Sequence, residues 1–235
     1  MDVSQLLSRL AKSELQNLAL SENGEIVEAS IAKVVGYIDE ALLRLHSRFV
    51  LRQDDVLVEM VDGISTYELK APYAMSYVEA DGETPQPHKY IIDMGPKKFQ
   101  DDVIRIIGAF DSLGHDMEMN NPMAPSSLFT PRPKVLQVPM PIPGQSLSVY
   151  YQAKHPPLDP GNLKIEIEIP EVMIGALTAY VGFLAFNGIG GPENMARAAS
   201  HEALYSNICL EIEQKDGMGT ETRSRSDVFE MRGFV

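Results

Sequence analysis

The chain has 235 residues, 44% hydrophobic and 23% charged, which supplies enough apolar side chains for a packed core and excludes disorder of the whole chain. The length suits one large domain or two small ones. Acidic residues outnumber basic ones by 33 to 20, a net charge of −13 without a Lys/Arg cluster, which argues against a protein that grips nucleic acid. The single cysteine, Cys209, excludes an internal disulfide and a thiolate zinc site.

The first fifty residues predict two helices. Apolar residues recur at three- and four-residue steps over 3–18 and again, more strongly, over 25–50. The sequence Ser-Glu-Asn-Gly at 21–24 separates the two patterns and indicates a short turn. We therefore expect a pair of amphipathic helices.

After these helices the apolar period changes to two, which is typical of strands. Residues 56–60 and 67–69 alternate around an Asp62-Gly63 turn and predict a hairpin. The stretch 71–95 is expected to be a loop, and the prolines of 120–143 favour extended edge segments. Further strands are predicted at 102–109, 115–119, 135–138, 146–153 and 162–169.

A second helical block is expected to open at Pro170 and to run to about Asn187. Gly175, Ala179 and Gly182 place small residues on one face of it, which allows another helix to approach closely. As a helix, its uncharged stretch 172–186 would reach about 22 Å, short of the ~30 Å hydrocarbon layer. We therefore expect a buried helix and no membrane contact.

The glycines of 188–191 are expected to end that helix, because they follow a helix and lack the Lys-Ser/Thr ending of a phosphate-binding loop. Pro192 then starts a last helix that runs to about Lys215. At the other end of the chain, charged residues interrupt the first apolar pattern, so we expect no signal peptide.

The sequence offers no catalytic constellation. His201-Glu202 begins like a zinc-protease helix, but Tyr205 stands where the second histidine is needed. Cys209 has no basic neighbour in its helix to activate it, which favours a structural thiol. The five histidines are too scattered to be paired with a carboxylate or a nucleophile.

Two acidic pairs, Asp54-Asp55 and Asp101-Asp102, lack the spacing of a calcium loop, so we interpret them as solvated strand starts. Taken with the preceding motifs, the sequence predicts no catalytic, cofactor-binding or metal-binding residues, no cofactor and no enzyme activity.

These patterns predict an α+β fold. A helical bundle of two N-terminal and two C-terminal helices would occupy 1–50 and 170–215. A β-rich inserted domain with a small antiparallel sheet would occupy 51–169, and a tail that is polar until Val228 would occupy 216–235.

The order of elements also carries a resemblance. Two helices, a Pro-rich sheet insertion with VLQVPMP at 135–141 and LSVYY at 147–151, and a small-residue helix opened by IPE at 169–171 precede a last helix and a polar tail. This order resembles the head-to-tail adaptor proteins of tailed bacteriophages over roughly residues 26–215.

The resemblance implies a virion protein, assembled in the host cytoplasm, that forms a homo-oligomeric ring, typically a dodecamer. Its implied partners are the portal protein and a tail or nozzle protein, and DNA would pass through the ring without specific binding. Family members grip the portal with an extended C-terminal arm, which the resemblance places at 216–235 of this chain; the alternative is a frayed terminus. The candidate portal-binding residues are Val228, Phe229, Met231, Phe234 and Val235.

Two other classes of function stay open at this point. One is another phage interaction protein, such as a tail-completion or capsid decoration subunit. The other is a small-ligand enzyme. A large ring that binds portal would favour the adaptor, whereas a monomer that turns over a metabolite would favour the enzyme.

Overall fold

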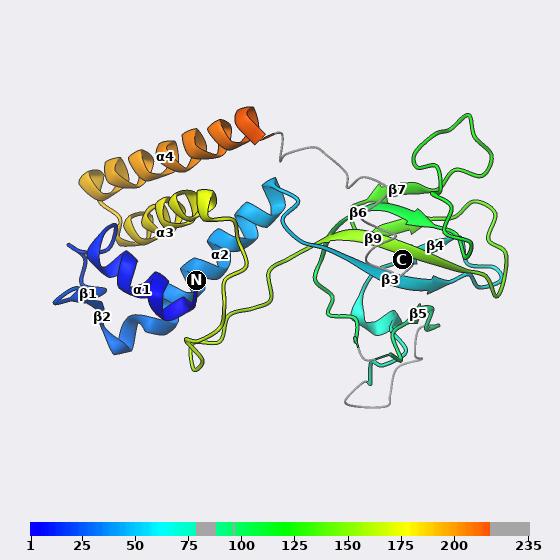
Figure 1. Cartoon of the computed structure of the whole chain (residues 1–235), viewed down its shortest axis with the longest axis horizontal. Helices are drawn as coiled ribbons and strands as arrows, with labels where there is room; N and C mark the ends of the chain where they lie inside the picture. Colours follow the sequence, from blue (N-terminus) through cyan, green and yellow to red (C-terminus); the bar gives the residue numbers. More distant parts are fainter. Residues whose placement is uncertain (79–87, 96, 217–235) are drawn as a thin grey trace. The chain divides into compact units, whose positions relative to one another are not determined.

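The computed structural model describes residues 1–78, 88–95 and 97–216, and it divides into two compact units (Figure 1). The helical unit comprises Met1–Val50 and the chain from His155 onward, and the sheet unit comprises Leu51–Lys154. The fold is therefore mixed α+β, with the sheet unit inserted within the sequence of the helical unit. The chain passes between the two units twice, after Val50 and after Lys154.

The first helix, α1 (Val3–Lys12), begins with a capping box. The Asp2 carboxylate accepts a hydrogen bond from the Gln5 amide at 2.7 Å, and the Gln5 side chain accepts one from the Asp2 amide at 3.1 Å. These bonds satisfy two of the amides that a helix start leaves without partners. The helix is shorter than its apolar pattern, because the chain leaves it at Lys12 and buries Leu15 from a turn.

The predicted break at 21–24 is a small hairpin of β1 (Ser21–Glu22) and β2 (Glu25–Ile26). Asn23 and Gly24 form its turn with φ of 52° and 81°, the left-handed conformation that Asn-Gly turns adopt. Because Glu25 and Ile26 belong to this hairpin, the long helix begins later than its apolar period predicts. It is α2 (Ile31–Arg48), entered through the 3₁₀ turn η1 (Glu28–Ser30).

Two helices complete the helical unit. α3 (Ile174–Ile189) follows the 3₁₀ turn η3 (Glu171–Met173), and α4 (Pro192–Asp216) follows α3 after a glycine break. Gly190 has φ of 74°, so the prediction that these glycines end the helix is confirmed. Figure 1 shows α3 between α2 and α4, and it packs against both.

The small-residue face of α3 is the surface on which α4 lies. A Cβ atom added to Gly182 would lie 2.8 Å from Nδ1 of His201, and one added to Gly175 would lie 3.5 Å from Cδ1 of Ile208. His201 and Ile208 are both α4 residues. The predicted close approach of a second helix is therefore confirmed.

Among the described residues, one helical stretch, Glu171–Ile189, is long and apolar enough to cross a membrane by length and composition. Half of its most apolar window is buried inside the helical unit, including Ala176, Leu177 and Val181. A buried core helix passes the same test, so the finding agrees with the buried helix that the sequence predicts. That the protein makes no membrane contact stays a prediction.

The larger sheet of the sheet unit has four antiparallel strands in the order β5-β3-β9-β6. The two central strands, β3 (Gln53–Glu59) and β9 (Ser146–Ala153), pair over all seven residues of β3. β6 (Val103–Phe110) and the short β5 (Ile91–Ile92) form the edges.

A smaller antiparallel sheet has the order β4-β8-β7, with β4 (Thr66–Glu68), β8 (Val135–Gln137) and β7 (Phe129–Arg132). A 3₁₀ turn, η2 (Ala71–Tyr73), follows β4. The strands predicted at 102–109, 135–138 and 146–153 are confirmed within one or two residues. Both sheets share one core, which includes Val58, Tyr67, Leu69, Ile91, Leu136 and Val149.

The predicted hairpin of 56–60 with 67–69 is wrong, because the two strands belong to different sheets. The turn itself exists, and Gly63 has φ of 74°. The Tyr67 hydroxyl accepts a hydrogen bond from the Val61 amide at 3.1 Å and donates one to the Ile64 carbonyl at 2.7 Å, so a side chain holds the turn. A turn signal is local and carries no information about which distant strand each arm pairs with.

The strand predicted at 162–169 is also wrong, although its alternation is real. Its carbonyls at Ile165 and Leu163 accept hydrogen bonds from the amides of Val3 and Ser4, at 3.1 and 2.9 Å. The segment therefore satisfies the start of α1 and buries Ile167 in the helical unit. The strand predicted at 115–119 is reduced to two isolated bridges.

Candidate functional site

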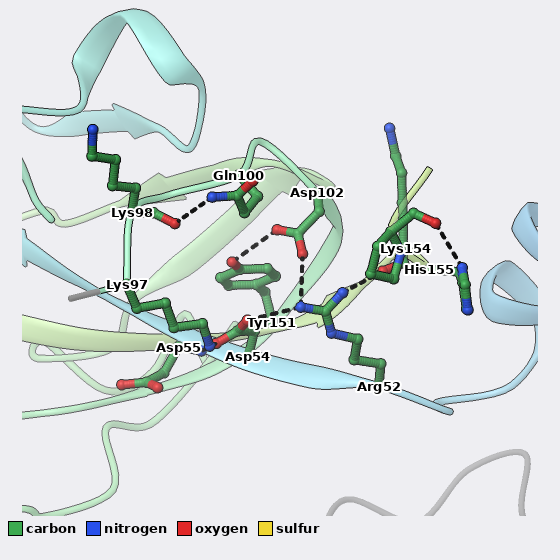
Figure 2. A network of polar contacts seen from close by, with 11 residues as sticks. Arg52, Asp54, Asp55, Lys97, Lys98, Gln100, Asp102, Tyr151, Lys154 and His155 are labelled. Carbon is green, nitrogen blue, oxygen red and sulfur yellow. Dashed lines mark hydrogen bonds and ion pairs between the residues drawn. The ribbon is translucent and has the colours of Figure 1, made fainter. Parts of the chain in front are cut away.

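A group of charged and polar side chains gathers where β3 begins (Figure 2). Arg52, directly before β3, places its guanidinium between Asp54 of β3 and Asp102, which precedes β6. Its Nη2 lies 3.5 Å from Oδ2 of Asp54 and 3.7 Å from Oδ2 of Asp102, and its Nη1 donates to the Lys154 carbonyl at 3.2 Å. The Arg52 carbonyl accepts a hydrogen bond from the Ala153 amide at 2.9 Å. The Arg52 backbone therefore links the start of β3 to the end of β9.

Two further residues complete the group. Tyr151 of β9 donates its hydroxyl to Oδ1 of Asp102 at 3.0 Å, and the Lys97 ammonium contacts Oδ1 of Asp54. Burial, reinforced by the negative charge of Asp102, raises the pKa of Tyr151 and keeps its phenol protonated as a donor. We refer to Arg52, Asp54, Lys97, Asp102 and Tyr151 as the charge cluster.

The charge cluster matches two cations with two carboxylates. Asp54 is 7% exposed and Asp102 is 9% exposed, so removing their partners would leave charges in a poorly solvated place. A cavity of about 200 Å³ beside the cluster also presents Asp93, whose carboxylate accepts the amides of Ser76 and Phe99 at 2.8 and 3.1 Å. Each of these carboxylates has a charged or hydrogen-bonding partner, and Oδ2 of Asp102 is buried with the Arg52 guanidinium nearby but without a hydrogen bond, so the arrangement fastens strands.

In the part of the chain that the structure describes, no three His, Cys, Asp or Glu side chains are placed to hold a metal ion. The interpretation of the acidic pairs as solvated is half wrong. Asp54 and Asp102 are buried in the charge cluster, whereas Asp55 is exposed and Asp101 is half-buried beside Lys134. Asp54 and Asp55 are neighbours in the extended chain of β3 and point to opposite faces, whereas Asp101 adopts a left-handed conformation, with φ of 51°, directly before the buried Asp102.

The residues of α4 considered above as catalytic candidates are packed against other side chains. The His201 ring stacks on Phe186 with centroids 5.4 Å apart, and Tyr205 and Cys209 are buried. Burial lowers the pKa of His201 and raises the pKa of Cys209, so both groups are uncharged near neutral pH. This agrees with the structural roles that the sequence favours for them.

The structure brings together two histidines that sequence reasoning could not pair. His46 and His155 meet edge to face with ring centroids 5.7 Å apart. Nδ1 of His155 donates to the Pro156 carbonyl at 2.7 Å, and Nε2 accepts the Glu168 amide at 3.4 Å. The pair packs the helical unit together.

An apolar groove opens on the sheet unit, with a volume of about 480 Å³. Two of its lining side chains, Met140 and Ile142, are 62% and 53% exposed. Asp111 and Gln145 supply polar groups to its wall. We call this feature the methionine groove; its apolar lining includes Met60, Met117, Leu128, Met140, Ile142 and Leu147.

The residues that the sequence singled out for portal binding lie outside the described residues, so their role stays a prediction; they are Val228, Phe229, Met231, Phe234 and Val235. The charge cluster and the methionine groove were missed, because their members come from segments far apart in the chain. One usable signal existed: Arg52 and Asp54 are two residues apart, which places them on one face of a strand.

A mixed α+β fold with an apolar groove on its surface is typical of a protein that binds a partner. The family model of the SU10 adaptor protein matches residues 1–227, and the chain belongs to this family of phage head-to-tail adaptors. The resemblance read from the sequence is thus confirmed, and the family is a structural one, not an enzymatic one. No curated protein matches the chain.

Proposed function

We propose that this chain forms a ring of identical subunits that joins the portal vertex of a phage head to the tail. The observation that carries the proposal is the family match over residues 1–227, because an adaptor family implies partners at the head–tail junction. The ring is a dodecamer with the portal protein on one side and a tail or nozzle protein on the other.

Each part of the subunit has a role in this proposal. The helical bundle forms the body of the ring, the inserted β-rich domain supplies a second surface, and the C-terminal segment forms the arm. A closed ring needs contacts between two different patches of one subunit. A helical unit and a sheet unit with unlike surfaces supply such a pair of patches, which supports the proposal.

The arm grips the portal through its apolar side chains. Val228, Phe229, Met231 and Phe234 stand in an otherwise polar segment, which suits anchors that become ordered on docking. Deleting 217–235 is expected to leave both units folded and to abolish retention of portal in a pull-down. Replacing Ser224 and Ser226 by alanine in the same segment is the matched control, and full retention by the truncated chain would reject the role of the arm.

DNA passes through the ring without being held. The net charge of −13 supports this proposal, because an acidic inner wall repels phosphates and lowers the chance of sticking during ejection. Placing the acidic side chains on an experimental structure of the assembled ring tests the idea. An inner wall that is neutral or basic would contradict it.

Negative-stain microscopy of the purified protein mixed with portal, together with its mass in solution, tests the whole proposal. The expected result is a closed ring stacked on the portal. A ring that binds a tail protein but no portal would instead indicate a tail-completion subunit, and binding to the capsid lattice a decoration subunit. A monomer that turns over a metabolite would indicate an enzyme.

A further inference from the structure

The methionine groove is a hollow in the surface of the sheet unit that is lined mainly by apolar side chains. A volume of about 480 Å³ lies within the range of built binding pockets, which is roughly 300–1,000 Å³. Methionine side chains adapt their shape to an incoming apolar group. More than half of Met140 and of Ile142 is exposed at the groove, so covering them would remove apolar area from water.

The charge around the groove limits what covers it. Met117 lines the groove between Asp116 and Glu118, which are both exposed, and Asp111 contributes a carboxylate to the wall. Hydrogen bonds from the His115 and Leu113 amides lower the pKa of Asp111, so it is ionised near neutral pH. The suitable occupant is therefore an apolar peptide segment that does not add further net negative charge.

The C-terminal segment of the chain has this chemistry. Its apolar residues stand among three arginines and three acids, so its side chains carry no net charge, in a chain whose net charge is −13. Residues 217–235 follow α4 and, at about 3.3 Å per residue, reach roughly 60 Å when extended. The composition and the reach both suit a segment that docks at a distance from the helix that carries it. The residues concerned are Arg223, Arg225, Val228, Phe229, Met231, Arg232 and Phe234.

We propose that the methionine groove of one copy binds segment 228–235 of a second copy. The inference rests on the proposed function, because the proposed function assigns the same segment to the portal. The same apolar residues that are assigned to the portal are thereby covered in subunits that have not yet met it. Portal and groove then compete for one segment.

Cross-linking of full-length chains tests the contact directly. A tagged Met140→Cys chain and an untagged Phe234→Cys chain are mixed and treated with a short bismaleimide. Met94→Cys replaces Met140→Cys in the control, because Met94 is a 73% exposed methionine of the sheet unit that does not line the groove. The natural Cys209 is buried and its pKa is raised by burial, so it reacts slowly.

The expected result is at least about tenfold more tagged–untagged product with Met140→Cys than with Met94→Cys, because docking raises the effective concentration of the two thiols. Adding Ile142→Glu to the tagged chain places a carboxylate in the groove and should reduce the product to the control level. Portal added before the reagent should also reduce it.

Two outcomes overturn the inference. Equal product with Met140→Cys and Met94→Cys excludes the groove as the docking site. Product confined to single chains that carry both Met140→Cys and Phe234→Cys shows that each groove takes its own segment. Either result leaves the portal pull-down unaffected, so a failure here is distinguishable from a failure of the proposed function.

Discussion

The two units of this protein place their arginine ion pairs in different surroundings, one partly solvated and one buried, as Arg48 and Arg52 show. In the helical unit, Arg48 bonds Glu213 through Nε at 2.7 Å, and both side chains are about 30% exposed, at 27% and 32%. In the sheet unit, Arg52 stands between Asp54 and Asp102, whose side chains are only 5% and 11% exposed. The longer ion pairs are the more important ones, because burial rather than distance decides what their loss costs.

The largest expected effect is that of Arg52→Met. It leaves two poorly solvated carboxylates with one cation fewer, and we expect a loss of about 3 kcal/mol in the stability of the sheet unit. Hydrogen exchange measured by mass spectrometry on peptides of each unit checks this, because it reports the two units separately. If Arg52→Met loses no more stability than Arg48→Met does, burial does not decide the cost of losing these ion pairs.

Tyr151→Phe sharpens the comparison within the sheet unit. The substitution keeps the buried ring but removes the donor to Asp102, and leaving that carboxylate oxygen without its bond should cost about 2 kcal/mol. Tyr150→Phe, one position along the same strand, is the control, because Tyr150 does not belong to the charge cluster. Equal exchange in the two variants would show that the Tyr151 hydroxyl contributes nothing.

Gly182→Ala probes the packing that holds the helical unit. The new Cβ would lie 2.8 Å from His201 Nδ1, so α3 and α4 must separate or the ring must leave Phe186, at a cost of about 1.5 kcal/mol. Gly36→Ala in α2 is the matched control, because no atom lies within 4 Å of its added Cβ. Gly36→Ala should stabilise the helix by about 0.7 kcal/mol. If urea unfolding shows that both substitutions change the free energy of unfolding in the same direction, the close approach of α3 and α4 is contradicted.

The smallest effect is expected for Arg48→Met, about 0.5 kcal/mol, since the pair with Glu213 is partly solvated. The hydrogen bond from Arg48 lowers the pKa of Glu213 below its ordinary value of 4.5. The stabilisation is therefore complete above pH 4.5 and is lost as the pH falls through the lowered pKa. Wild type and Arg48→Met should converge in acid, and a constant difference across that range would show that the charge of Glu213 is not involved.

The elements that could be predicted from the sequence are those with a strong local period. The long helix, the glycine stop after α3 and the two long strands β6 and β9 follow from spacing alone. The pairing of β3 could not be predicted, since its partners are distant and the Asp62-Gly63 turn pointed to β4 instead. The alternation at 162–169 was read as a strand because packing on a helix start buries every second residue in the same way.

The charge cluster illustrates a different limit. Asp54 and Asp102 each belong to a pair of adjacent acids, and the one local sign of which member turns inward is Arg52, two residues before Asp54. That choice depends on Arg52 and Tyr151, which arrive from other strand positions only when β3, β9 and β6 pair. Long-range pairing must come first, so the site could not be assembled from spacing.

The sheet unit is entered and left at neighbouring strand ends, where the Ala153 amide bonds the Arg52 carbonyl and the Arg52 side chain bonds the Lys154 carbonyl. A mechanical load that pulls apart the two connections to the helical unit, after Val50 and after Lys154, would act on one end of the β3–β9 pair. It would break the hydrogen bonds between these strands one after another. Arg52 lies at this end of the strand pair, and both its carbonyl and its guanidinium form hydrogen bonds there. Arg52 therefore adds a side-chain hydrogen bond to the backbone bond at the end of the strand pair where such a load would first act.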